Sequence, residues 1–82
     1  MTREEEIRAE KKHVTRKIEE LLKADPRSGI SSCEYITKEH LGAVGEYVEI
    51  TTRSGQKSRI CVTADSLGAI LRDVTRQVYH YG

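Results

Sequence analysis

The chain has 82 residues, of which 33% are charged and 37% hydrophobic, and its formal net charge is +1. This length predicts one domain over 1–82 with a small core, because a domain of roughly 60 to 80 residues buries only about 60% of its unfolded surface. The near-zero net charge disfavours a dedicated nucleic-acid binder, and the lack of an apolar run of roughly 18 residues argues against a membrane span.

Residues 2–24 are predicted to form the first helix. Glu, Lys and Arg, which favour helix, dominate this segment. Thr2 is the expected N-cap and Glu5 would complete a capping box. Pro26 ends the helix, because proline disfavours helical backbone in the residue before it.

The apolar side chains of this helix form one narrow stripe. Their spacing repeats at the helical period, so they share a face that we expect to pack on the protein's own sheet. Some of them are a heptad apart, so a short coiled coil between two copies is the alternative. The stripe contains Ile7, Val14, Ile18 and Leu21, and the self-association surface would be Ile7, Val14 and Leu21.

The central segment, residues 32–63, is predicted to form an antiparallel sheet. Residues 32–37 are rich in β-favouring types, and residues 38–45 are predicted to be a loop. Residues 46–52 and 57–63 each alternate polar and apolar types around a glycine-containing turn, which indicates a β-hairpin.

Alternation divides this hairpin into an inward and an outward face. The inward face would carry Val48, Ile50, Ile60 and Val62. The outward face would carry Tyr47, Glu49, Thr51, Arg59, Cys61 and Thr63.

The last predicted element is a helix over residues 65–81 with Asp65 as its N-cap. Its apolar stripe is wide and consists of Leu67, Ile70, Leu71, Val74, Val78 and Tyr81. The element order predicts an α+β fold of the αβββα type: a three-stranded antiparallel sheet with both helices on one face. The other face of that sheet would then be uncovered.

No residue pattern indicates catalysis, a cofactor or a metal. Cys33 and Cys61 lack the close paired spacing of structural zinc sites, even with His13, His40 and His80 considered beside them. A Ser66, Asp73 and His80 triad has no nucleophile elbow to support it. So few cysteines in a small chain, and an acidic N-terminus unlike a signal peptide, favour the reducing cytoplasm.

A basic cluster surrounds the predicted hairpin turn and consists of Arg53, Lys57 and Arg59. Such a cluster could contact phosphate oxygens, with Tyr47 stacking on a base. We favour the other interpretation, a solvated hairpin whose charges discourage aggregation through the strand edge. Arg72 and Arg76 of the last helix would add to a nucleic-acid surface.

Two families resemble this chain in element order. The order is similar to that of the double-stranded-RNA-binding domain, which has a basic run at the start of its last helix. The matching residues here, 63–70, contain an acid and neither Lys nor Arg, so the resemblance does not extend to that family's RNA contacts. Small phage-encoded inhibitors, including some anti-CRISPR proteins, also resemble the chain in size, charge density and element order. That second resemblance implies binding to a larger host protein.

The sequence therefore predicts a non-enzymatic protein-binding module, a regulator or inhibitor that is a monomer or a homodimer. Its partner is expected to be another protein, and a nucleic-acid-binding module with a basic hairpin is the alternative. The predicted partner-binding residues are Tyr47, Glu49, Thr51, Arg53, Lys57 and Arg59.

Overall fold

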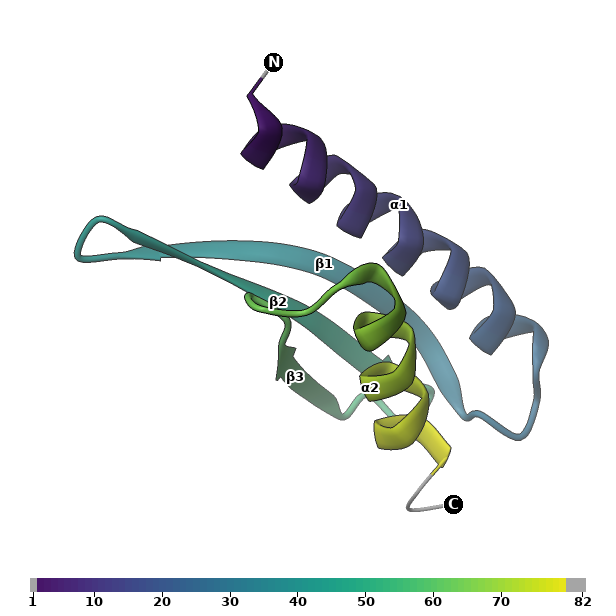
Figure 1. Ribbon diagram of the computed structural model, residues 1–82. Coiled ribbons are helices and arrows are strands. Elements are labelled where there is room, and N and C mark those ends of the chain that lie inside the picture. Colours follow the sequence, from purple (N-terminus) through teal and green to yellow (C-terminus); the bar gives the residue numbers. More distant parts are fainter. Residues whose placement is uncertain (1, 80–82) are drawn as a thin grey trace.

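The computed structural model describes residues 2–79 and has the predicted αβββα order (Figure 1). The helices and strands are α1 (Arg3–Ala24), β1 (Ile30–His40), β2 (Ala43–Thr52), β3 (Lys57–Cys61) and α2 (Leu67–Tyr79). No helix in this part of the chain is both long enough and apolar enough to cross a membrane.

The ends of α1 follow the predicted signals. The Thr2 hydroxyl accepts a hydrogen bond from the Glu5 amide at 3.2 Å, which satisfies one of the free donors in the first turn. Asp25 is the C-cap residue with extended backbone, and its own amide donates back to the Leu22 carbonyl. The residue before Pro26 is therefore where the helix stops.

The buried face of α1 differs from the predicted stripe. It consists of Lys11, Thr15, Ile18 and Leu22, which follow one another at helical spacing. Of the predicted stripe, Ile18 is buried and Val14 is half-buried, whereas Ile7 and Leu21 are exposed. The prediction was wrong here because it counted only apolar side chains, and two of the four buried positions are polar residues that find hydrogen-bond partners.

The sheet has the order β1-β2-β3 and both strand pairs are antiparallel. The predicted loop over residues 38–45 is wrong, because β1 and β2 continue through it and join at a two-residue turn. Leu41 and Gly42 form that turn with φ of 52° and 81°. Positive φ at both central residues is the geometry of a tight hairpin turn, for which Leu is an unusual residue.

The β1–β2 hairpin is consequently a long arm. Figure 1 shows it extending well past the end of β3. Residues 37–43 are all exposed, and Leu41 at the tip is 93% exposed.

Both helices cover one face of the sheet. Val48 and Ile50 alternate on that face of β2 and belong to one buried cluster with residues from both helices. The cluster contains Ile18, Leu22, Ile30, Cys33, Val48, Ile50, Val62, Ile70 and Val74. The predicted inward residues of the hairpin are confirmed, although Ile60 is only half-buried and Val62 lies just beyond β3.

The start of α2 corrects another prediction. Ser66, rather than Asp65, is the capping residue, since its hydroxyl accepts a hydrogen bond from the Ala69 amide at 3.2 Å. Ile70 and Val74 are the buried residues of the helix. Its predicted final turn, which includes Tyr81, lies outside the described residues.

Candidate partner-binding site

The face of the sheet opposite the helices is the candidate site, called here the open face. Its residues alternate along each strand with the buried ones, so they point away from the core. Strand register groups them into rows across the sheet. The rows are Lys38–Gly45, Ile36–Tyr47–Cys61, Glu34–Glu49–Arg59 and Ser32–Thr51–Lys57.

The apolar centre of the open face is the row formed by Ile36, Tyr47 and Cys61. Ile36 and Tyr47 are half-buried although neither α1 nor α2 covers this side, because they lie opposite each other on neighbouring strands. The Tyr47 ring lies over Gly45, where an added Cβ would come within 2.9 Å of the hydroxyl oxygen. A glycine is therefore required at position 45 for the ring to lie along the sheet toward the arm.

Glu49, in the next row, pairs with one cation of its own row and one of the row beyond. The Arg59 Nε donates to the Glu49 carboxylate at 3.0 Å, and the Lys57 Nζ is 3.9 Å from the other Glu49 oxygen. The basic cluster predicted from the sequence is thus partly compensated by an acid on the adjacent strand. Arg53 is exposed at the turn, and its amide donates to the Gly29 carbonyl.

The six predicted partner-binding residues are brought together only in part. Tyr47, Glu49, Thr51, Lys57 and Arg59 share the open face, whereas Arg53 lies in the turn at its end. Ile36 is the member that sequence reasoning missed. Its strand lacked clean alternation, so the face to which Ile36 belonged could not be assigned without the register.

A buried polar network on the helix side holds the sheet under α1. The Lys11 ammonium is 3.0 Å from the Val62 carbonyl, 3.2 Å from the Thr63 carbonyl and 3.3 Å from the Glu46 carboxylate, so each of its protons has an acceptor. Glu46 also accepts the Tyr35 hydroxyl proton at 2.6 Å. Burial, followed by this hydrogen bond, raises the pKa of Tyr35 above its ordinary value.

This network acts as a structural clamp. Lys11 is only 4% exposed and Glu46 is also buried, which leaves a narrow approach for another molecule. Opposite charges 35 residues apart are common in any sequence, so no sequence signal distinguishes this pair. The network joins α1, β2 and the segment after β3, and it thereby fixes the side of the sheet that the helices cover.

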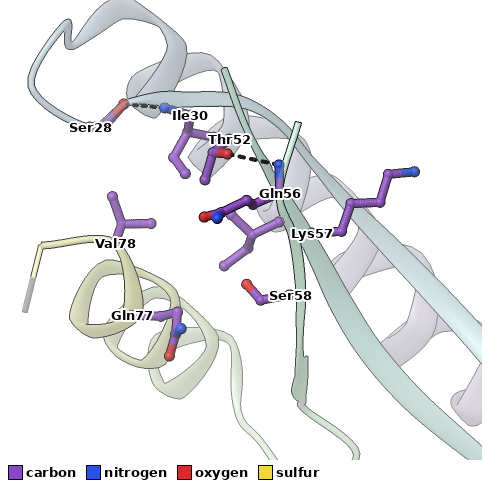
Figure 2. Close-up of a pocket in the computed structure, with 9 residues that line it drawn as sticks. Ser28, Ile30, Thr52, Gln56, Lys57, Ser58, Gln77 and Val78 are labelled. Carbon is purple, nitrogen blue, oxygen red and sulfur yellow. Dashed lines mark hydrogen bonds between the residues drawn. The ribbon is translucent and has the colours of Figure 1, made fainter. Parts of the chain in front are cut away.

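A groove of about 650 Å³ lies on the helix side, between α2 and the turn that joins β2 to β3 (Figure 2). Gln77 and Val78 of α2 line one side, and Gln56 and Ser58 line the other. Figure 2 shows Lys57 pointing away from this groove, which agrees with its place on the open face. The lining residues are mostly neutral, so the groove offers little of the charge that an acid–base site requires.

The two cysteines lie on opposite faces of the sheet. Cys33 is buried in the core and Cys61 is exposed on the open face, and both are free thiols. Burial, and next the nearby Glu19 carboxylate, raise the pKa of Cys33 to about 11. Because Cys33 and Cys61 lie on opposite faces of the sheet, geometry excludes a metal site or a disulfide that uses both thiols. In residues 2–79 no group of His, Cys, Asp or Glu side chains is arranged to hold a metal ion.

The Ser66, Asp73 and His80 combination, which the sequence already disfavoured, is described only in part. The Ser66 hydroxyl caps α2, and Asp73 accepts a hydrogen bond from the neighbouring Arg72 at 3.2 Å. His80 lies outside the described residues.

No match to this chain was found among protein-family models, among curated proteins or among solved structures.

Proposed function

We propose that this protein is a non-enzymatic protein-binding module, a regulator or inhibitor of a larger protein, which docks through its open face. The observation that carries the proposal is the arrangement of the helices. Both cover the same side of the sheet, and the other side presents an apolar row between polar and charged ones. An apolar centre with a polar rim is the usual anatomy of a protein–protein interface.

The residue types on this face support binding to a protein. Tyr and Arg are the side chains most often responsible for interface affinity, and Tyr47 and Arg59 are both held in place by neighbours. A side chain that is already ordered loses less conformational freedom on binding. A partner that suits this face would offer an apolar contact for Ile36 and Tyr47 with polar groups around it.

The arm adds a second contact point. Leu41 is almost fully exposed and adopts a backbone conformation that is unfavourable for a leucine. In residues 2–79 its side chain contributes no core packing that would offset this strain. A costly apolar residue at an exposed tip supports a role outside the fold itself.

The test compares two matched variants in partner capture. Ile36→Thr with Tyr47→Thr removes the apolar row and keeps strand-favouring residues, whereas Leu71→Gln changes an exposed apolar residue of α2 on the other side of the sheet. We expect the wild type and the α2 variant to capture the same proteins from source-cell lysate, and the open-face variant to lose them. Unchanged capture by a folded open-face variant would refute the proposal.

The nucleic-acid alternative is weaker on this geometry. Lys57 and Arg59 extend from the open face and are near Glu49, whereas Arg72 and Arg76 are exposed on α2 on the helix side. The cations therefore do not form one surface. If the alternative were correct, DNA or RNA would bind at low salt and the affinity would fall steeply as salt is added, because bound phosphates release counterions.

The proposal also places the protein in a reducing compartment, the cytoplasm. This location is supported by the two free thiols, which lie on opposite sides of one sheet and cannot form a disulfide within the chain. Recovery of both thiols in reduced form after rapid alkylation of source cells would agree with it, and recovery of an oxidised form would contradict it.

A further inference from the structure

The outer edge of β1 exposes backbone groups that have no strand partner. Two bonds show which residues of β2 turn toward β3: the Thr52 amide donates to Gln56 at 2.9 Å, and the Val62 amide donates to Glu46 at 2.8 Å. Even-numbered residues of β2 therefore bond to β3 and odd-numbered ones bond to β1, since the direction alternates along a strand.

The β1–β2 register then assigns the edge. Even-numbered residues of β1 pair with the odd-numbered residues of β2, so the odd-numbered residues of β1 turn their backbone outward. The Cys33 amide is satisfied by the Glu19 carboxylate at 2.9 Å. In the part of the chain that the structure describes, the outward amides and carbonyls of Tyr35, Thr37 and Glu39 have no partner.

From Ser32 to His40 this edge is continuous, with no proline and no bulge to prevent strand-to-strand pairing, and its charged residues Glu34 and Lys38 are of opposite sign. β3, the opposite edge, is only five residues long and carries Lys57 and Arg59. β1 is thus the edge that is prepared to accept another strand.

We propose that two copies of this chain pair through the free edges of β1, antiparallel and centred on Ile36. In this register Tyr35 of each copy lies opposite Thr37 of the other, so each such pair exchanges both backbone hydrogen bonds. Glu34 lies opposite Lys38 of the other copy, which places an ion pair on each side of the centre. The two Ile36 side chains meet between these ion pairs, on the open face.

Charge selects this register over its neighbours. Pairing centred on Thr37 would place Lys38 opposite Ile36, and pairing centred on Lys38 would place two ammonium groups against each other. Only the register centred on Ile36 matches Glu34 with Lys38 in both directions.

A second complementarity lies on the helix side. In the same register, Glu39 of one copy comes opposite Cys33 of the other, and Glu39 shares the helix side of the sheet with Cys33. A groove of about 360 Å³ next to Cys33 is lined by Lys12, Arg16 and Glu19 of α1. The arriving carboxylate would therefore meet two basic side chains and one acidic side chain, the Glu19 carboxylate that accepts from the Cys33 amide.

The contact is small, so the dimer is weak. The Cys33 amide already donates to the Glu19 carboxylate, so it is not available to the carbonyl of a partner strand. This bond limits the number of residues over which the two β1 strands can pair. An interface below about 1,200 Å² is typical of transient association. The dimer would nevertheless join the two open faces into one continuous surface. Formation of the dimer does not depend on what that surface binds.

The experiment is sedimentation equilibrium of the full chain from about 10 µM to about 1 mM, a range that covers weak association. We expect a concentration-dependent dimer. Glu34→Lys alone and Lys38→Glu alone should each weaken it at least about tenfold, because each places like charges opposite one another. The double exchange, which restores opposite charges, should return the dissociation constant to within about threefold of the wild type.

Thr37 offers a matched backbone test. Thr37→Pro removes an outward amide and no hydrogen bond to β2, so the fold should persist while the dimer is lost. Thr37→Ala keeps the amide and should keep the dimer. Circular dichroism of both variants verifies that each is folded.

Three results would overturn the proposal. One is a monomer at every concentration. Another is a charge exchange that fails to restore association. The last is a dimer whose dissociation constant is unchanged by every β1 variant but which dissociates with Leu21→Glu. That result would show pairing through the exposed flank of α1 instead.

Discussion

Replacement of Leu41 by Asn is predicted to stabilise this protein. Leu41 has a φ of 52° and is followed by Gly42 at 81°, so both central residues of the arm's turn are in the left-handed region. That region disfavours a leucine, and Asn-Gly is the preferred pair for a two-residue hairpin turn. Leu41→Asn therefore relieves strain without any change of register.

The size of the effect follows from exposure and conformation. A left-handed conformation costs an ordinary residue roughly 1–2 kcal/mol, and Asn recovers part of this. Leu41 is 93% exposed, so its replacement removes almost no buried apolar surface. We expect a gain of about 1 kcal/mol, which for a domain of this size raises Tm by about 4–8 °C.

Urea unfolding followed by circular dichroism measures this gain, and amide exchange in residues 38–45 reports whether it is local to the arm. Leu21→Asn is the control, because Leu21 is also exposed, at 68%, but lies within a helix. That change should destabilise by about 0.5 kcal/mol, since Asn is a poorer helix former. An unfolding midpoint and arm exchange that stay unchanged in Leu41→Asn would refute the strain argument.

The remaining predictions concern three side chains and their partners. Lys11→Met should destabilise by about 3 kcal/mol or more in urea unfolding, because it removes the countercharge of the buried Glu46 carboxylate and the donor of two carbonyls. The same change at an exposed α1 lysine should have little effect. Cys61 should be alkylated much faster than Cys33 in timed mass-spectrometric mapping, since hydrogen bonds lower the pKa of Cys61 whereas burial raises that of Cys33; equal rates would contradict this. The hydrogen bond from Tyr79, the largest cause, lowers the pKa of Asp25, so its stabilising contribution is present above the ordinary value of 3.8 and is lost as the pH falls through the folded-state pKa. Tyr79→Phe should therefore reduce stability at neutral pH, and the difference from the wild type in urea unfolding should shrink as the pH falls through the folded-state pKa.

The fold was predictable because its signals are local. The Thr2 cap and Pro26 set the limits of the first helix, and alternation in the hairpin identified Val48 and Ile50 as core residues. Two of the three wrong predictions failed for one reason. The loop over residues 38–45 and the purely apolar stripe of α1 both assumed that residue type decides position, whereas distant partners decide it here.

Leu41 illustrates the first failure. Leucine is one of the weakest signals of a hairpin turn. The turn forms here because ten β1–β2 residue pairs align beside it. Lys11 illustrates the second, since a lysine is buried only where acceptors surround its ammonium group, and those acceptors are at least 35 residues away.

The amino-acid sequence by itself determined the order of the elements, their approximate limits and the inward residues of the hairpin, because periodicity and capping act between near neighbours. Only the tertiary structure decided which acid partly compensates the basic turn, that Ile36 joins Tyr47 on the open face, and that the edge of β1 has no strand beside it within residues 2–79. Each of these depends on strand register, and register is set by contacts among residues far apart in the chain.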